Sequence, residues 1–212
     1  MFHKKTSLLI MIFLMVSLLS KAQYEKDTKF WQVEGTFSGN ITSNDTKGAT
    51  SLTTDHANHT IAIAFKRAKF SEDFLAKGWL LDYTLQSSTY SSSNSSTNNN
   101  YFHTIKAGYF VDKFKPLNKS LAIYGEIVGK IGYGFRTGNI TYIYDYNTYQ
   151  LEAGVNFGAR YFLKKNLFIN GQTSLVNLNL QHYKIGTEQQ TNLMLNSIMN
   201  VSSLSISIGK TF

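Results

Sequence analysis

Residues 149–163, "YQLEAGVNFGARYFL", alternate between two kinds of side chain along their whole length. One alternate set, from Tyr149 to Leu163, is apolar or small, and the other contains Gln150, Glu152 and Arg160. A β-strand points successive side chains to opposite faces, so this segment predicts a long strand with one apolar and one polar face. The main question for the fold is therefore which of the two faces meets the surroundings.

The rest of the chain repeats this pattern between turn signals, and helical periodicity is absent after the first residues. The segment 59–70 alternates only softly. In 167–183 the alternation changes phase between Leu175 and Val176, which indicates either a β-bulge or an error in the register. We predict eight strands, at about 29–41, 59–70, 77–90, 100–112, 120–137, 140–163, 167–183 and 199–212.

The predicted connections alternate in length. Polar segments at 42–58, 91–99 and 184–198 predict long loops, whereas those at 71–77, 113–120 and 164–166 are short, and a hairpin is expected to turn at 137–139. Transmembrane barrels have long extracellular loops and short periplasmic turns. An even number of strands then places both ends of the chain on the periplasmic side.

The polar face carries isolated charges whose signs balance, as a packed barrel interior requires, because a buried charge is costly unless it is paired. The alternative is a soluble β-sandwich or lipocalin-like barrel with the apolar face inside. Aromatic residues fall at the expected strand ends, where membrane barrels carry aromatic girdles. The predicted interior charges are Glu34, Lys66, Asp82, Lys106, Glu126, Lys130, Glu152 and Arg160. The predicted girdle residues are Trp31, Trp79, Tyr109, Tyr161 and Phe212 at one end and Tyr101, Tyr133, Phe135 and Tyr149 at the other.

Residues 1–22 have the layout of a secretory signal, with two lysines, a short apolar run and small residues before a cleavage point after Ala22. Residues 23–212 then form one exported domain. The absence of cysteine excludes disulfides and thiol chemistry. The formal charge of +8 includes three lysines of the leader, so the exported part carries +5. An exported chain without a basic-aromatic cluster does not suit nucleic acid, and anionic lipid headgroups are the better partner.

A signal sequence, eight alternating strands, aromatic girdles and the terminal Phe212 together resemble the small outer-membrane β-barrels of the OmpA/OmpX type, within the porin-like family. The resemblance implies an all-β, eight-stranded, antiparallel up-and-down transmembrane β-barrel in the bacterial outer membrane. It also implies contact with lipopolysaccharide. In that family a terminal aromatic residue after alternating apolar residues is read by the barrel-assembly machinery, a role that Phe212, Ile208 and Ile206 would take here.

The segment "NITYIYDYNTY" continues the alternation beyond the length that a bilayer needs and places Tyr142, Tyr144 and Tyr146 on one face. Tyrosine is favoured in binding surfaces, and an exposed strand edge can pair with another chain. We therefore expect a surface-interaction role of the adhesion type that the resemblance implies, with an extracellular protein or glycan as ligand. The alternative is that this hairpin only packs on lipopolysaccharide sugars or neighbouring loops.

Catalytic patterns are weak in this sequence. Asp55, His56 and His59 lie together in a polar segment and could bind a metal, but a loop that happens to contain histidines explains them better. His103 and His182 could join one of many serines in a lipid-modifying enzyme, which is the third choice. We expect no enzyme activity, no cofactor and no metal. A narrow channel for small solutes, gated by rearranged interior charges, is the second choice.

Overall fold

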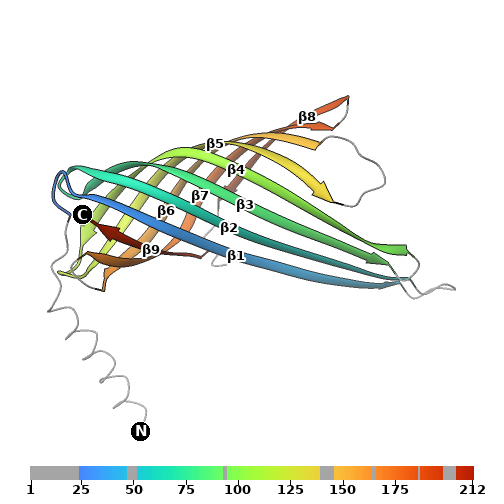
Figure 1. Cartoon of the computed structure of the whole chain (residues 1–212), viewed down its shortest axis with the longest axis horizontal. Helices are drawn as coiled ribbons and strands as arrows, with labels where there is room; N and C mark the ends of the chain where they lie inside the picture. Colours follow the sequence, from blue (N-terminus) through green and yellow to red (C-terminus); the bar gives the residue numbers. More distant parts are fainter. Residues whose placement is uncertain are drawn as a thin grey trace, which may run out of the picture.

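The computed structural model describes residues 24–46, 52–92, 95–138, 146–163, 166–185, 187–197 and 204–212, so the predicted signal lies outside the described residues. These residues form an all-β antiparallel sheet whose up-and-down strands close in a ring of eight, as predicted (Figure 1). Within these ranges, no helix has the length and apolar character needed to cross a membrane. The ring consists of β1 (Lys29–Thr46), β2 (Leu52–Glu72), β3 (Leu75–Ser92), β4 (Ser95–Pro116), β5 (Leu121–Gly138), β6 (Tyr146–Phe162), β7 (Leu167–Ile185) and β9 (Ser205–Thr211), and β8 (Glu188–Ser197) pairs with β7 beside it.

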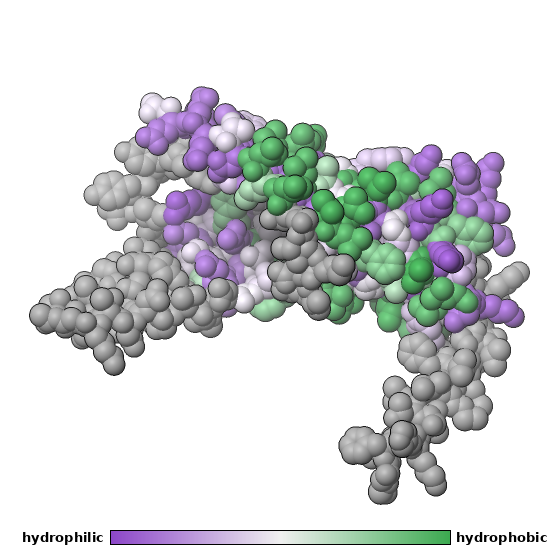
Figure 2. Space-filling view, turned by 180° about the vertical axis from the view of Figure 1, so that it is seen from behind, coloured by the Kyte–Doolittle hydropathy of each residue, from purple (hydrophilic) through white to green (hydrophobic). Residues whose placement is uncertain are grey.

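The two faces of β6 answer the question raised by its alternation. Leu151 and Val155 are 54% and 40% exposed, whereas Glu152 and Arg160 are buried inside the ring. The same division holds around the middle of the ring, where apolar side chains cover the outside and charged or amide side chains lie inside. Hydrophobic residues gather over the middle of the outer surface, and hydrophilic residues gather toward its two ends (Figure 2). The sheet thus has the opposite arrangement to a soluble barrel with an apolar interior.

Two polar segments that were expected to be long loops are instead the ends of strands, so those predictions were wrong. β1 runs to Thr46 and β2 begins at Leu52, with Thr42 paired to His56. β3 and β4 approach equally closely, ending at Ser92 and beginning at Ser95. The physical reason is that two paired strands beyond the apolar part of the outer surface can be polar on both faces and still pair their backbone groups. The change to polar residues therefore marks the end of the apolar surface and not the end of the strands.

The end of the chain also differs from the prediction. β7 reaches Ile185 and β8 begins at Glu188, so the expected long connection at 184–198 is a tight hairpin. The expected last strand, 199–212, is shorter in the structure, where β9 spans Ser205–Thr211. The predicted turn at 137–139 was wrong as well, because β5 continues through Gly138; residues 139–145 lie outside the described residues. The short connections that follow β2 and β4 are as predicted.

The predicted phase change in β7 is a β-bulge. Val155 pairs with Val176, but the next residue of β6, Asn156, pairs with Ser174. Leu175 is therefore the extra residue, and the register is irregular at the position that the alternation indicates. Because of the bulge, the apolar residues on both sides of it point outward although their numbering changes parity: Ile169 precedes it, and Val176 and Leu178 follow it.

The ring closes mainly near the chain termini. β9 pairs with β1 over Phe30–Gly35 and with β7 over Leu167–Gln172. Beyond Gly35, this edge of β1 has no partner among the residues that the structure describes, and β8 diverges from β1 (Figure 1). We call the part of the ring around Phe30, Phe168 and Thr211 the terminal end. The opposite part, where β3 and β7 end and β4 begins, is the distal end.

Candidate functional site

The interior at the terminal end is filled by aromatic rings, which the sequence-based prediction had not placed there. Neighbouring rings lie in contact, with centroids 5.0 Å apart for Tyr24 and Phe114 and 5.7 Å apart for Phe162 and Phe168. Except for Tyr24, which precedes β1, and Phe168 on β7, these side chains share the inward parity of the predicted charges on the same strands. That parity is the signal that could have found them. The cluster is formed by Tyr24, Phe30, Phe70, Phe110, Phe114, Tyr124, Phe162 and Phe168.

The residues before β1 form a strap across this end. The Asp27 amide donates to the carbonyl of Phe70 (2.9 Å), and the Phe74 amide donates to the carbonyl of Tyr24 (3.0 Å). Phe74 adopts a positive φ of 67° in the tight turn between β2 and β3. The strap inserts the Tyr24 ring among the aromatic side chains, and burial raises the pKa of its phenol to about 12, although the nearby Arg160 guanidinium acts in the opposite direction.

Arg160 is fully buried in this aromatic cluster, and its charge is not balanced as predicted. Its guanidinium carbon lies 4.0 Å from the ring centroid of Phe168 and 4.4 Å from that of Phe30. Its Nε donates to the Asn170 side chain at 2.9 Å, and its Nη2 donates to the Gln32 side chain at 3.1 Å. Within the described residues no carboxylate forms an ion pair with it. Ring faces and amide oxygens therefore stabilise this cation.

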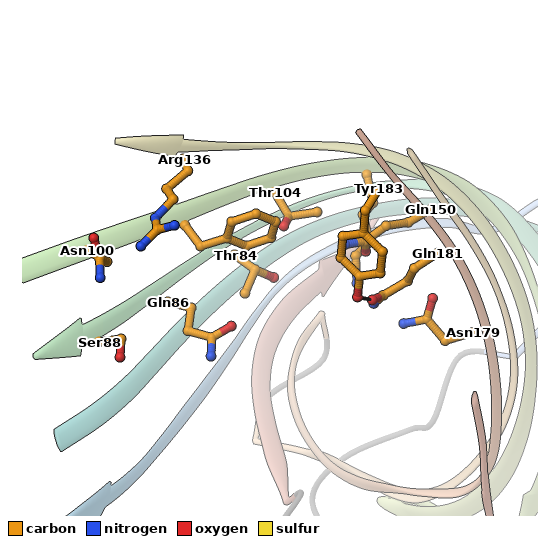
Figure 3. A pocket seen from close by; sticks show the side chains of 12 residues that line it. Thr84, Gln86, Ser88, Asn100, Thr104, Arg136, Gln150, Asn179, Gln181 and Tyr183 are labelled. Carbon is orange, nitrogen blue, oxygen red and sulfur yellow. Dashed lines mark hydrogen bonds between the residues drawn. The ribbon is translucent and has the colours of Figure 1, made fainter. Parts of the chain in front are cut away.

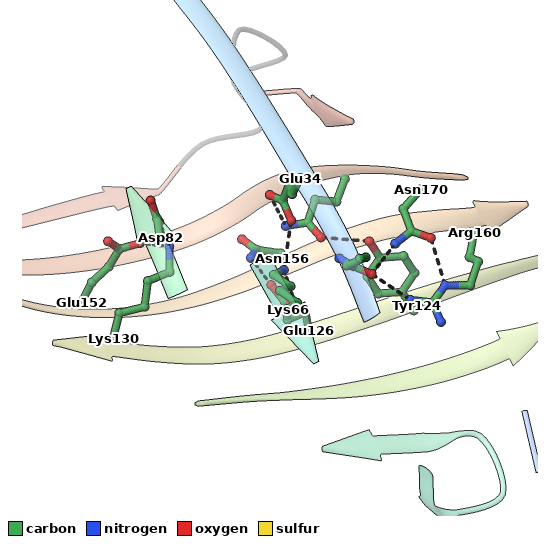
Figure 4. Close-up of polar contacts among 12 residues, drawn as sticks. Glu34, Lys66, Asp82, Tyr124, Glu126, Lys130, Glu152, Asn156, Arg160 and Asn170 are labelled. Atoms are coloured by element: carbon green, nitrogen blue, oxygen red, sulfur yellow. Dashed lines mark hydrogen bonds and ion pairs between the residues drawn. The ribbon is translucent and has the colours of Figure 1, made fainter. Parts of the chain in front are cut away.

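Next to Arg160, on the side toward the distal end, lies a first group of ion pairs centred on Lys66, which we call the lower ion layer. Its Nζ is 2.7 Å from the Glu126 carboxylate and 3.1 Å from that of Glu34 (Figure 4). The Asn156 amide donates to the other oxygen of Glu126 at 2.7 Å. Asp112, which the prediction missed, is also buried here and lies beside Glu126 in the register of β4 and β5. Its inward parity, shared with Lys106 on the same strand, could have identified it.

The upper ion layer lies nearer the distal end. Lys130 contacts both Asp82 and Glu152, each at 3.2 Å, and Lys106 contacts Glu152 at 2.8 Å. The Asn177 amide donates at 3.0 Å to Glu152 Oε1, the oxygen that Lys130 also contacts. Glu126 on β5 and Glu152 on β6 lie on adjacent strands, as their places in the predicted strands imply. The structure joins Glu152 to Lys130, and it joins Glu126 to Lys66 instead of Arg160.

Beyond the upper ion layer the interior opens into a cavity of about 490 Å³, which we call the distal cavity (Figure 3). Its walls come from β3, β4, β5, β6 and β7, and they are mostly amide and hydroxyl side chains. The interior thus changes from packed rings and ion pairs at one end to a hollow, hydrogen-bonding surface at the other. Its lining comprises Thr84, Gln86, Ser88, Asn100, Phe102, Thr104, Lys106, Arg136, Gln150, Asn179, Gln181 and Tyr183.

The remaining predicted residues lie on the outside or beyond the described ranges. Ile206, Ile208 and Phe212 are outward and about half exposed, at 64%, 48% and 54%. Tyr142 and Tyr144 lie outside the described residues; Tyr146 pairs with Ile185, and its side chain is not described.

The two histidines predicted near strand ends contact hydroxyl groups in the structure. His103 contacts the Tyr83 hydroxyl at 2.8 Å and the Thr137 hydroxyl at 2.9 Å, and His182 contacts the Thr191 hydroxyl at 2.9 Å. His56 lies in strand β2, not in a loop. Across the described ranges, no three histidine, aspartate or glutamate side chains gather as metal ligands.

No protein-family model matches this chain, and a search of curated proteins finds no relative of it.

Proposed function

We propose that this chain is an integral β-barrel of a bacterial outer membrane, with both termini on the periplasmic side and the distal end outside the cell. The observation that carries the proposal is the apolar outer surface around a charged interior. Ile127 and Ile131 on β5 are each 66% exposed, whereas Glu126, the residue before Ile127, is 1% exposed. A surface of this kind is unfavourable in water and favourable against lipid chains, and ring closure supplies the backbone partners that lipid cannot.

The packed interior supports a surface role over solute conduction. Arg160 and the rings of Phe30, Phe114 and Phe168 fill the terminal end without exposed area, or nearly so. Above them, Lys66 and Lys130 each bridge two carboxylates from different strands. Moving these groups aside would separate buried charges, which is costly. A filled core of this type suits a stable platform that presents its distal end to the surroundings.

In this proposal the barrel is non-enzymatic and its role is surface interaction of the adhesion type. Lipopolysaccharide surrounds the distal end, and an extracellular protein or glycan is the ligand. The outward apolar residues Ile206 and Ile208 on the last strand, with Phe212 directly after it, serve as the signal for the barrel-assembly machinery. The resemblance to small OmpA/OmpX-type barrels supports this assignment, because it implies the same signal and an adhesive role.

The first experiment compares boiled and unboiled samples of the detergent-folded protein by gel mobility, followed by reconstitution into lipid vesicles and flotation. A closed membrane barrel gives a heat-dependent mobility shift and floats with the vesicles after an alkaline wash. Planar-bilayer recordings of the same sample should show no steady conductance. Solubility without detergent and no mobility shift would overturn the membrane assignment, and steady conductance would overturn the filled-core argument.

Adhesion is tested on cells that display the barrel. Replacing Tyr142, Tyr144 and Tyr146 by Ser should reduce binding of the cells to host-cell or glycan surfaces without changing the heat-dependent mobility shift. The matched control replaces Tyr101, Tyr133 and Tyr149 by Ser, which are outward but 40%, 40% and 58% exposed on the barrel wall. Equal binding by wild type and the first variant would exclude the tyrosine row as the contact.

A further inference from the structure

The distal cavity has the size and placement of a ligand site. At about 490 Å³ it lies within the roughly 300–1,000 Å³ range of small-molecule pockets. Five consecutive strands form its wall, so its side chains are held on a rigid sheet and not on loops. It lies at the end of the interior away from the chain termini, beyond the Lys106–Glu152 pair.

Several polar groups of this cavity lack protein partners. The side chains of Asn100 and Asn179 line the cavity, and their amide oxygens are buried and accept no hydrogen bond from any described residue. A buried acceptor without a donor costs roughly 1–3 kcal/mol, so these two oxygens favour a ligand that carries donors. In Figure 3, Asn100 and Arg136 lie on one side of the cavity and Asn179 on the other, so a ligand between them can reach both.

The charge of the cavity is positive. Arg136 lines it, and among the described residues no carboxylate forms an ion pair with this guanidinium. The other base, Lys106, already contacts Glu152 at 2.8 Å, and no aspartate or glutamate belongs to the lining. Arg136 is therefore the group that is available to bind an anion, and guanidinium binds carboxylates well through paired N–H donors.

We propose that the distal cavity binds an acidic saccharide, with its carboxylate at Arg136 and its hydroxyls donating to the oxygens of Asn100 and Asn179. Sugar hydroxyls donate and accept, which suits a wall of amides and hydroxyls such as Gln86, Gln150 and Gln181. The rings of Phe102 and Tyr183 supply apolar surface for the C–H face of a sugar ring. An apolar ligand would leave the two oxygens unpaired, and a bare anion would use Arg136 alone.

This inference rests on the proposed function, because only an outward distal end gives the cavity access to extracellular glycans. It is tested by isothermal titration of the detergent-folded protein with a disaccharide of glucuronic acid and N-acetylglucosamine. Maltose is the neutral probe and inorganic phosphate is the bare anion. A polyoxyethylene detergent is required, because sugar-headed detergents would compete for the same cavity.

We expect saturable one-to-one binding of the acidic disaccharide, with maltose at least about tenfold weaker, as the loss of one charge-assisted contact implies. Phosphate should not saturate over the same concentrations. Arg136→Gln should remove the preference for the acidic sugar, and Asn179→Leu should weaken both sugars. The matched control is Arg67→Gln, because Arg67 is exposed on the outer face of β2 and should leave binding unchanged.

Three results would overturn the saccharide site: no saturation by the acidic disaccharide, equal affinity in wild type and Arg136→Gln, or phosphate binding as tightly as the sugar. Each titrated sample is also checked for its heat-dependent mobility shift and vesicle flotation. A sample that floats but does not bind overturns the saccharide proposal and leaves the membrane barrel intact. A sample that does not float overturns the proposed function, whatever its affinity for sugars.

Discussion

The two ends of the barrel interior are built from the same alternating strands but differ in how they are filled. At the terminal end, Arg160 and the large rings are buried against one another, and β9 completes the ring between β1 and β7. At the distal end, small polar side chains leave a cavity of about 490 Å³, and the edge of β1 beyond Gly35 has no second neighbour in the described part of the chain. The same ring thus has a packed interior at the terminal end and a polar cavity at the distal end.

The difference follows from side-chain volume and not from backbone geometry. On β4, the inward residues Phe114, Phe110 and Lys106 lead from the terminal end toward Thr104 and Asn100 at the distal end. Eight strands leave an interior that large side chains can fill and small ones cannot. Stability should therefore be concentrated at the terminal end, and tolerance to change at the distal end.

The largest expected effect separates the two ion layers. Lys66→Met leaves the buried carboxylates of Glu34 and Glu126 without their cation, and breaking such a pair costs about 3–5 kcal/mol. Lys106→Met should cost less than half as much, because Glu152 keeps Lys130 at 3.2 Å. Urea unfolding in lipid vesicles, followed by tryptophan fluorescence, measures both changes.

The control for this experiment is the double variant Lys66→Met/Glu126→Gln, which removes one buried charge of each sign. It should recover part of the stability lost in Lys66→Met. Equal losses for Lys66→Met and Lys106→Met would show that the two layers contribute alike, and the contrast between the ends would then not extend to the ion pairs.

The next effect concerns the strap at the terminal end and depends on pH. Burial raises the pKa of Tyr24 to about 12 from the ordinary value of 10.0, so the folded state holds this proton more tightly than the unfolded chain does. The protonated Tyr24 phenol therefore contributes fully to the free energy of unfolding below pH 10, and this contribution is lost as the pH rises toward 12. At 1.36 kcal/mol per pKa unit, the loss amounts to about 2–3 kcal/mol.

Tyr24→Phe should remove that alkaline loss, and unfolding curves at pH 8, 10 and 12 measure it. At pH 8 the variant should be as stable as wild type or more so, because the Tyr24 hydroxyl is buried without a hydrogen-bond partner among the described residues. Tyr149→Phe, at an exposed outer position, is the matched control. An unchanged alkaline slope in Tyr24→Phe would show that the phenol is not held in the aromatic cluster.

The smallest effect tests the closure of the ring. A Cβ at Gly209 would lie 2.5 Å from the carbonyl oxygen of Trp31 and within contact of the Phe168 ring. Gly209→Ala should therefore destabilise the barrel by about 1–3 kcal/mol, as overpacking does. Gly125→Ala meets nothing within 4 Å and should instead gain about 0.5–1 kcal/mol from the lower entropy of the unfolded chain. The difference in urea midpoint between the two variants measures how much stability depends on the close packing of β1 against β9.

Sequence alternation predicted the ring, the direction of its faces and the phase change between Leu175 and Val176, because these depend on a period of two that the residues display directly. It left open whether the phase change is a bulge or an error in register, and the structure shows a bulge. It did not predict the length of the distal ribbons. Residues such as Thr42 and His56 carry no apolar signal, yet their backbone groups pair as in any strand. The hairpin of β7 and β8 was missed for the same reason, since "EQQTN" is polar on both faces.

The interior was predicted less completely than the ring. Charges attract attention as costly groups, so Lys66 and Glu152 were found, but Phe110 and Asp112 share their parity and were overlooked. Rings were expected on the outside as girdles, although parity places many inside. The partners of Arg160 could not be predicted, because its contacts with Gln32 and Asn170 depend on which strands close the ring.

The bulge at Leu175 makes β7 unusually tolerant of one specific deletion. The alternation changes phase at the place where the backbone has its extra residue. Removing Leu175 therefore cancels both changes and leaves Ile169, Val176 and Leu178 on the outer face. Removing a residue elsewhere in the strand would move the outward side chains that follow it to the inner face, and the inward ones to the outer face. Only a deletion at position 175 is therefore expected to keep the inward and outward faces of β7. A sequence that lacks Leu175 should form the same strand without the bulge.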